Sequence, residues 1–344
     1  MPNKRPLIHL MYTGGTIGSV ELPHGGGLHP IDFEHLNQHI PELGRLDVDI
    51  EVVSVGQPKD SSDMRPADWA GMAKHIFSNH GSVDGFVILH GTDTMAYTAS
   101  ALSFMLQGLR KPVVLTGSQL PIGKIRTDGK ENVLSAIEVA ATQHEGVPLL
   151  QEVAVYFEYK LFRGNRIRKY STEHFHAYVS PNYPVLAEAG VDIQFNAAAL
   201  WRPKAGELQS LPEMDAAVLP LRLFPGIPSS LYEQMGLSRS VRAVVLETFG
   251  FGNAPFDSGL MEQIERWSQA GVFVMQISQC WHGSLSPGKY KTGKAMQDLG
   301  VFNGRDLSFE AALVKCMHAL GQANELSGVR SIMNRNIAGE FTEF

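Results

Sequence analysis

Short continuous apolar runs recur along the chain, and stretches with helical spacing of apolar residues separate most of them. In the first part of the chain these runs predict strands at Leu7–Tyr12, Val48–Val55, Gly85–His90, residues 111–117 and Glu152–Phe157. A continuous run, unlike an alternating one, is typical of a strand that is covered on both faces. The pattern therefore predicts a mainly parallel sheet with helices packed against it.

Helices are predicted near residues 66–77, 95–109 and 129–141. After residues 196–213, which mix proline, glycine and charge as linkers do, the pattern restarts. The later strands are expected over residues 216–224, 242–249 and 271–278, and the later helices over residues 227–235, 255–270 and 307–321. We predict an α/β fold with a larger N-terminal domain over residues 1–195, a linker over 196–213 and a smaller C-terminal α/β domain over 214–344. Each domain is expected to form around a mainly parallel sheet.

Composition and charge narrow the class of protein. The 344 residues are 44% apolar and carry a net charge of -6, which excludes the basic surface typical of nucleic-acid-binding proteins. No apolar stretch approaches the roughly 20 residues of a membrane span, and the first run is too short for a signal peptide. Cys280 and Cys316 form no disulfide framework and are expected to be buried thiols. We expect a cytoplasmic protein with a small-molecule ligand, without nucleic acid or membrane as partner.

Hydroxyl and carboxylate side chains follow several of the predicted strands. Ligands of open α/β sheets bind beyond the carboxyl ends of the strands, so these side chains are candidate site residues. They are Thr13 and Thr16 after the first strand, Asp60, Ser61 and Ser62 after the second, and Thr92, Asp93 and Thr94 after the third.

Thr16 lies in a glycine-rich turn, TGGTIG, for which two interpretations remain open. The G-G-x-x-G order without a lysine matches neither the dinucleotide fingerprint nor the P-loop, and the prolines and glycines that follow disfavour the helix that a phosphate site needs. Either the turn presents the Thr16 hydroxyl to a ligand, with Gly14 and Gly15 allowing close approach, or Thr16 only caps a β-turn.

Thr92 and Asp93 allow two interpretations as well. A helix needs only one N-cap, and a hydroxyl beside a carboxylate suits a nucleophile or a water-positioning group. A threonine nucleophile needs a base, and Lys169 is a candidate for the lysine of a Ser-Lys type arrangement. The alternatives are a simple helix cap at Thr92 and a solvated basic face around Lys169.

No metal site is predicted. His35 and His39 have helical ligand spacing but lack the H-E-x-x-H frame, and His174 and His176 alternate like strand residues. No G-x-S-x-G motif surrounds Ser118, so the serine-hydrolase elbow is missing.

Taken together, the segments TGGTIG, DSSDM and HGTDTMAYTASALSFML closely resemble those of the L-asparaginases, specifically the bacterial type I, cytoplasmic branch. The segments KPVVLTGSQLP, RTDGKENVLSAIEVAA, RGNR, SPNYPVLAEAG and GFGNAP extend the similarity over nearly the whole chain. The resemblance implies hydrolysis of L-asparagine to L-aspartate and ammonia, with no metal and no organic cofactor. It also implies homodimers or homotetramers, with Asn253 as a candidate interface residue.

The resemblance assigns roles motif by motif. Thr16 would attack the side-chain amide, and backbone N–H groups near Thr16 and Thr92 would stabilise the oxyanion. Thr92, Asp93 and Lys169 would form a second cluster for proton transfer or for attack on the acyl-enzyme. Which threonine acts in which half-reaction stays open.

The substrate's α-amino and α-carboxylate groups would be held at the end of the second strand. The resemblance gives this role to Asp60, Ser61 and Ser62, and Asp93 would share the ammonium because a zwitterion needs acceptors at one end and donors at the other. Preference for asparagine over glutamine is not fixed by these residues, since one methylene discriminates by only about 1–3 kcal/mol.

One departure from the family pattern supports a rival hypothesis. Family members carry a tyrosine in the segment after TGGTIG, and the matching place here holds Leu28. The rival is a non-catalytic amino-acid sensor that kept the pocket and lost the chemistry. A third hypothesis, the asparaginase-like subunit of a tRNA-dependent amidotransferase, is disfavoured by the acidic balance and by a first strand that starts at Leu7.

A second departure concerns regulation. Some type I members bind asparagine at a separate activating site through an arginine that here is Glu247. We therefore expect this activation to be absent or altered, and the rate of ammonia release to rise hyperbolically with asparagine concentration. A sigmoidal curve that becomes hyperbolic on changing Glu247 would contradict the prediction.

Overall fold

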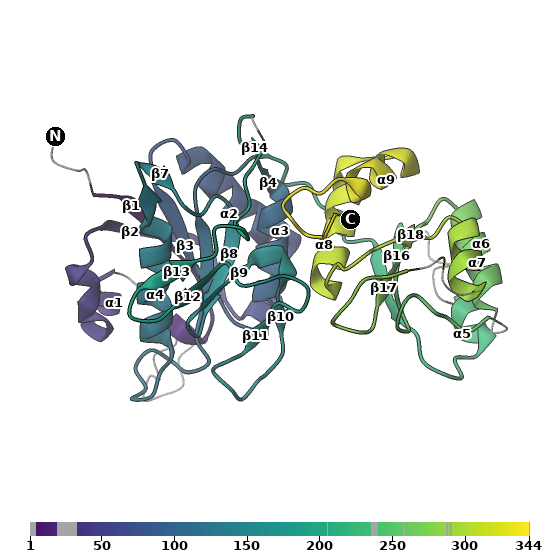
Figure 1. Ribbon diagram of the computed structural model, residues 1–344, viewed down its shortest axis with the longest axis horizontal. Helices are drawn as coiled ribbons and strands as arrows, with labels where there is room; N and C mark the ends of the chain where they lie inside the picture. Colours follow the sequence, from purple (N-terminus) through teal and green to yellow (C-terminus); the bar gives the residue numbers. More distant parts are fainter. Residues whose placement is uncertain are drawn as a thin grey trace. The chain divides into compact units, whose positions relative to one another are not determined.

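The computed structural model describes residues 5–18, 33–204, 206–234, 240–256, 259–286, 288 and 291–343 (Figure 1). The chain divides into two units, Met1–Pro212 and Glu213–Phe344. Each unit has its own sheet and its own apolar core, so each is described by itself.

An eight-stranded sheet forms the centre of the first unit. In sheet order its strands are β13 (Ile193–Phe195), β12 (Ala187–Ala189), β9 (Lys160–Arg163), β8 (Val153–Phe157), β5 (Val113–Thr116), β3 (Gly85–Leu89), β1 (Leu7–Gly14) and β2 (Asp49–Lys59). The five strands from β8 to β2 pair in parallel, and β9, β12 and β13 continue the sheet with antiparallel pairs. The predicted mainly parallel α/β sheet is confirmed.

Helices cover both faces of this sheet. They are α1 (Phe33–His39), α2 (Pro66–Asn79), α3 (Met95–Met105) and α4 (Gly129–Ala141). In β1, Ile8, Leu10 and Tyr12 join the core cluster that includes side chains of α1 and α4. His9 belongs to the opposite face, where it contacts His75 of α2. Because both faces are buried, β1 is a continuous apolar run, as the sequence indicated.

Short elements complete the first unit. They are the 3₁₀ turns η1 (Thr16–Gly18), η2 (Pro41–Arg45), η3 (Ser61–Asp63) and η4 (Gly164–Arg166), and the two-stranded pairs β4 (Leu106–Gln107) with β14 (Gln209–Ser210), β6 (Gln143–His144) with β7 (Val147–Pro148), and β10 (Arg168–Lys169) with β11 (Tyr178–Val179). The expected linker over residues 196–213 stays a prediction, although β14 within it pairs with β4 of the first unit.

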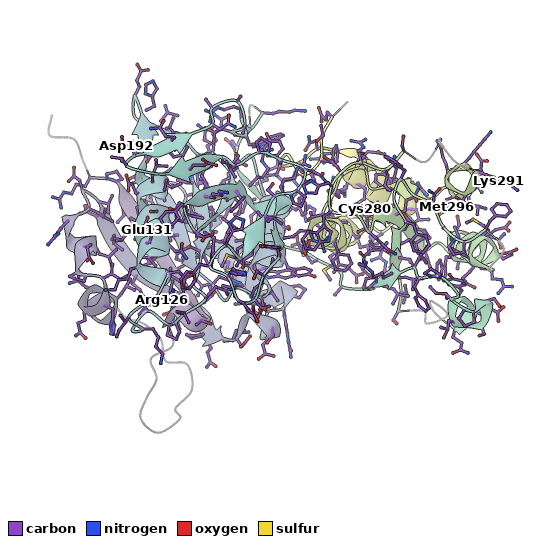
Figure 2. All side chains as sticks on the ribbon, turned by 60° about the horizontal axis from the view of Figure 1, so that its bottom comes forward. Arg126, Glu131, Asp192, Cys280, Lys291 and Met296 are labelled. Carbon is purple, nitrogen blue, oxygen red and sulfur yellow. The ribbon has the colours of Figure 1, made fainter. Side chains whose placement is uncertain are left out.

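The second unit is built on a four-stranded parallel sheet, β15 (Val218–Arg222), β16 (Ala243–Thr248), β17 (Phe273–Ser278) and β18 (Phe302–Asn303). Its helices are α5 (Ser229–Gln234), α6 (Leu260–Gln269), α7 (Lys291–Asp298), α8 (Phe309–Gln322) and α9 (Leu326–Asn334). On α7, Met296 is buried in the core of this unit, whereas Lys291 is exposed (Figure 2). The Nζ atom of Lys291 lies 4.3 Å from the centre of the Phe256 ring. Among the described helices, none combines the length and the apolar character that crossing a membrane requires.

Three local expectations need correction. The helix expected to start at residue 255 starts at Leu260, after Gly259 with a φ of 77°. The helix expected to reach residue 109 ends at Met105, where β4 begins. Of the two cysteines expected to be buried, Cys316 is buried and Cys280 is exposed.

A buried ion pair fixes the segment that leads to Lys169. Arg163, the last residue of β9, donates through Nε to Glu152 Oε2 at 2.6 Å, and each side chain is only 3% exposed. The same guanidinium donates to Ala199 O at 2.8 Å, and Glu152 accepts from the backbone N–H of Trp201. The pair thereby joins the sheet, the chain toward η4 and the 199–201 segment at one point.

We expect Glu152→Gln to lower the free energy of unfolding by about 3 kcal/mol, because a buried guanidinium loses its compensating charge. Asp47→Asn, which removes the carboxylate of the exposed Arg5–Asp47 pair, should change it by less than about 1 kcal/mol. Urea unfolding of both variants measures the difference. Equal effects would show that burial does not set the cost.

Candidate active site

The sequence-predicted residues occupy loops at the carboxyl ends of neighbouring strands. Thr16 opens η1 after β1, Asp60 precedes η3 after β2, and Thr92 and Asp93 lie between β3 and α3. Because β1 lies between β2 and β3 in a parallel sheet, these three loops emerge at the same edge. Lys169 arrives from β10.

Glycines let the first loop touch its neighbours at backbone distance. Gly14 and Gly15 have φ angles of 114° and 87°. A Cβ atom on Gly14 would lie 2.1 Å from Lys59 O, and one on Gly15 would lie 2.5 Å from Gly91 N and Cα. The two glycines therefore allow the loop of Thr16 to lie directly against the loop of Thr92.

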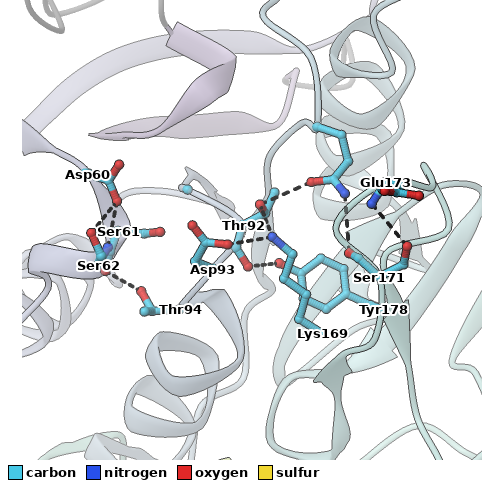
Figure 3. A network of polar contacts seen from close by, with 12 residues as sticks. Asp60, Ser61, Ser62, Thr92, Asp93, Thr94, Lys169, Ser171, Glu173 and Tyr178 are labelled. Atoms are coloured by element: carbon cyan, nitrogen blue, oxygen red, sulfur yellow. Dashed lines mark hydrogen bonds and ion pairs between the residues drawn. The ribbon is translucent and has the colours of Figure 1, made fainter.

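Lys169 joins Thr92 and Asp93 into one cluster (Figure 3). Its Nζ donates to Thr92 Oγ1 at 2.8 Å and to Asp93 Oδ1 at 2.7 Å. The Thr92 hydroxyl in turn donates to Gln119 Oε1 at 3.3 Å. The lysine side chain is 16% exposed and the aspartate 64%, so the cluster opens to the outside on the aspartate side. A lysine amine shared by a hydroxyl and a carboxylate is suited to moving a proton at Thr92.

Tyr178 holds the same turn, a role that was not predicted from the sequence. It pairs with Lys169 in the antiparallel β10–β11 ladder, and its OH donates to the backbone carbonyl of Thr92 (Figure 3). Burial raises the pKa of Tyr178 well above its ordinary value, so the phenol keeps its proton as a donor. The sequence signal near it was the strand-like alternation at His174 and His176, which is wrong for those residues: they lie in irregular structure, and the strand β11 (Tyr178–Val179) starts after them. Gln119 was missed as well.

Asp60, Ser61 and Ser62 form a compact turn of their own. Asp60 caps η3: its Oδ1 accepts from the backbone N–H of Ser62 at 2.8 Å and from the Ser62 hydroxyl at 2.7 Å. These hydrogen bonds lower the pKa of Asp60, so it stays a carboxylate. The buried Ser61 accepts at its carbonyl from Thr94 Oγ1 at 2.6 Å, which ties this turn to the start of α3 (Figure 3). The turn offers a fixed negative charge beside two hydroxyls.

The remaining candidates make contacts of their own. His176 pairs through Nδ1 with Glu158 at 2.9 Å, and in the part of the chain that the structure describes no three metal-ligating side chains gather. Glu247, in the second unit, accepts from Arg222 at 3.0 Å. The position of Leu28 and the side chain of His35 lie outside the described residues.

Family models match both halves of the chain. The model of the asparaginase N-terminal domain matches residues 7–201, and that of the glutaminase/asparaginase C-terminal domain matches residues 217–333. The chain belongs to the asparaginase family. The resemblance carried by its threonine motifs is thereby confirmed.

Individual relatives of this asparaginase-family chain match over nearly full length. It is 39% identical to L-asparaginase 1 of Escherichia coli K12, covering 97% of this chain and 98% of that protein. The crystal structure of L-asparaginase I from Vibrio cholerae superposes with a TM-score of 0.88 at 38% identity, covering 99% of this chain and all of that one. The thermostable L-asparaginase of Thermococcus kodakarensis gives a TM-score of 0.89 at 32% identity, with 98% and 100% of the two chains covered.

Gly15→Ala should be much more damaging than Gly56→Ala. Both glycines have a positive φ, 87° and 73°, but a Cβ at Gly56 meets nothing within 4 Å. We expect Gly56→Ala to cost about 1–2 kcal/mol of stability through backbone strain alone. Gly15→Ala adds a collision with Gly91, so we expect a larger loss of stability and a fall in ammonia release of about 100-fold. Urea unfolding and a coupled ammonia assay measure both, and equal losses would exclude the loop contact as the cause.

Proposed function

We propose that the chain hydrolyses the side-chain amide of L-asparagine to L-aspartate and ammonia through a threonine-bound acyl-enzyme. The observation that carries the proposal is the placement of Lys169 Nζ within hydrogen-bond distance of both Thr92 Oγ1 and Asp93 Oδ1. The family membership of both halves of the chain supports the same chemistry.

Substrate recognition rests on the charges of the amino-acid end. Asp60 and Asp93 supply carboxylates for the α-ammonium, and Ser61 and Ser62 supply hydroxyls for the α-carboxylate, that of Ser62 by turning from Asp60 Oδ1, to which it donates without substrate. The lowered pKa of Asp60 supports this role because the group stays charged at neutral pH. The reacting amide then lies toward the two threonine loops.

In the first half-reaction Thr16 Oγ1 bonds to the amide carbon, its proton leaves to a base, and the carbonyl oxygen becomes an oxyanion. The C–N bond then breaks as the leaving nitrogen takes up a proton, which releases ammonia. In the second half-reaction water adds to the acyl carbon and the bond to Thr16 breaks, restoring the hydroxyl. The Thr92–Lys169 cluster carries the protons, and backbone N–H groups at Thr16 and Thr92 stabilise the oxyanions.

The setting of the reaction belongs to the proposal as well. We propose a cytoplasmic enzyme that works without a metal or organic cofactor, as a homodimer or homotetramer, with asparagine as its small-molecule partner. The rival function, an amino-acid sensor without turnover, is separated from it by a single assay because it predicts binding of asparagine with no ammonia.

Thr16→Ala, Thr92→Ala and Lys169→Ala should each reduce kcat for ammonia release by about 1,000-fold or more, because each removes a group that acts on reacting atoms. Thr142→Ala, which removes a hydroxyl that bonds within its own helix end, should leave activity unchanged. A coupled ammonia assay with L-asparagine and L-glutamine measures both the loss and the preference. Near-normal activity of Thr16→Ala would remove it from the mechanism, and no ammonia from the wild-type chain would favour the sensor.

A further inference from the structure

His90 is a buried titratable group that the proposed mechanism does not use. It follows β3 directly and precedes Gly91 and Thr92, and its backbone N–H donates to Thr116 O at 2.8 Å. Its side chain has no exposure to solvent. Buried polar atoms are normally hydrogen-bonded, so both ring nitrogens of this imidazole are expected to have a partner.

The hydrogen bonds around His90 have only one consistent direction. Its Nδ1 lies 2.7 Å from Gly91 O, and because a carbonyl only accepts, Nδ1 carries the proton. In the neutral ring Nε2 is then an acceptor, and it receives the hydroxyl of Thr98 at 2.9 Å. Trp69 Nε1, which only donates, gives its hydrogen to Thr98 Oγ1 at 2.9 Å. The chain therefore runs from Trp69 through Thr98 and His90 to Gly91 O.

This direction requires a neutral ring. Burial lowers the pKa of His90 to about 4, so the imidazole carries no charge at neutral pH and Nε2 remains an acceptor. Thr98 departs from its neighbours in the same helix in a way that fits this role. Ser100 and Ser103 return their hydroxyls to carbonyls of α3 itself, whereas Thr98 directs its hydroxyl out of the helix to the ring.

The end of the chain of hydrogen bonds fixes a peptide plane. Gly91 O and the N–H of Thr92 belong to one peptide unit, and in a trans peptide they point in opposite directions. The described peptide bonds are trans, so the group that holds Gly91 O also sets where the Thr92 N–H points. Tyr178 holds the next carbonyl, that of Thr92, in the same way. Two successive peptide planes are thus set by buried donors.

We propose that His90 is a positioning residue for the hydrolysis: by holding Gly91 O it aims the Thr92 N–H at the oxyanion, and Thr98 and Trp69 hold its ring in the tautomer that this requires. The inference rests on the proposed function, in which the Thr92 N–H is an oxyanion donor. The other neutral tautomer, with its proton on Nε2, would place an accepting Nδ1 against Gly91 O. This would favour rotation of the Gly91–Thr92 peptide. The oxyanion would then face a carbonyl oxygen in place of a donor.

Thr98→Val tests the relay with little change in side-chain volume, and Ser103→Ala is the matched control in the same buried helix. We expect Thr98→Val to lower kcat for asparagine by about tenfold with KM within about twofold, because the donor acts on the transition state more than on bound substrate. Thr98→Ser should recover most of the lost kcat. Ser103→Ala should leave both constants unchanged, since its hydroxyl donates to Ala99 O within the helix itself. Unchanged kcat in Thr98→Val, or a rise in KM that accounts for the whole loss, would overturn the proposal.

His90→Asn and His90→Ala give an independent pair, because the asparagine amide can donate from near the place of Nδ1. We expect the asparagine variant to keep a kcat about tenfold above the alanine variant, and equal values would overturn the proposal. Nitrogen-15 NMR of the wild-type chain needs no variant: the His90 proton is expected on Nδ1, and a proton on Nε2 would also overturn it. An inactive wild type would instead contradict the proposed function, so the two failures are distinguishable.

Discussion

The site depends on one constraint, the contact of two loop backbones at Gly15 and Gly91 without an intervening side chain. Gly91 in turn leaves no room for a Cβ against Ser61, so the loops after β1, β2 and β3 meet at a single glycine. Parallel strands bring the loops to one edge of the sheet, but only the missing side chains bring them into contact. Thr16 directly follows Gly15, and Thr92 directly follows Gly91. The distance between the two threonines is therefore set by the backbone contact and not by side-chain packing.

Much of the fold was predictable because short segments of the sequence determine their own secondary structure. Buried parallel strands are continuous apolar runs, and residues such as Pro66 and the apolar face of α2 mark a helix without any knowledge of the partners. The antiparallel strands β12 and β13 were not predicted, because three-residue strands carry too little periodicity to be recognised. The start of α6 at Leu260 was missed because Phe256 lies four residues before Leu260, which is the spacing of one helix face.

The site divides in the same way. Glycines and hydroxyls after strands identified the loops of Thr16, Asp60 and Thr92 as candidates, and the family resemblance gave Lys169 its place. Tyr178 and Gln119 escaped because their parts depend on which backbone carbonyl or hydroxyl lies nearby, which spacing along the chain does not encode. His90 is the first residue of the HGTDT motif. The hydrogen bonds of its two ring nitrogens are evident only from the structure, which places Trp69 and Thr98 beside it.

The pairing of Lys169 with Tyr178 has a consequence for how the protein matures during synthesis. Both residues act on Thr92, which precedes them by 77 and 86 positions. A growing chain that has already formed β1, β3 and α3 therefore holds a threonine turn without its ammonium and without its phenol. In the proposed mechanism the proton-transfer group arrives only with the β10–β11 hairpin, so we expect a ribosome-bound or truncated chain that ends before it to release no ammonia, however well its sheet has assembled.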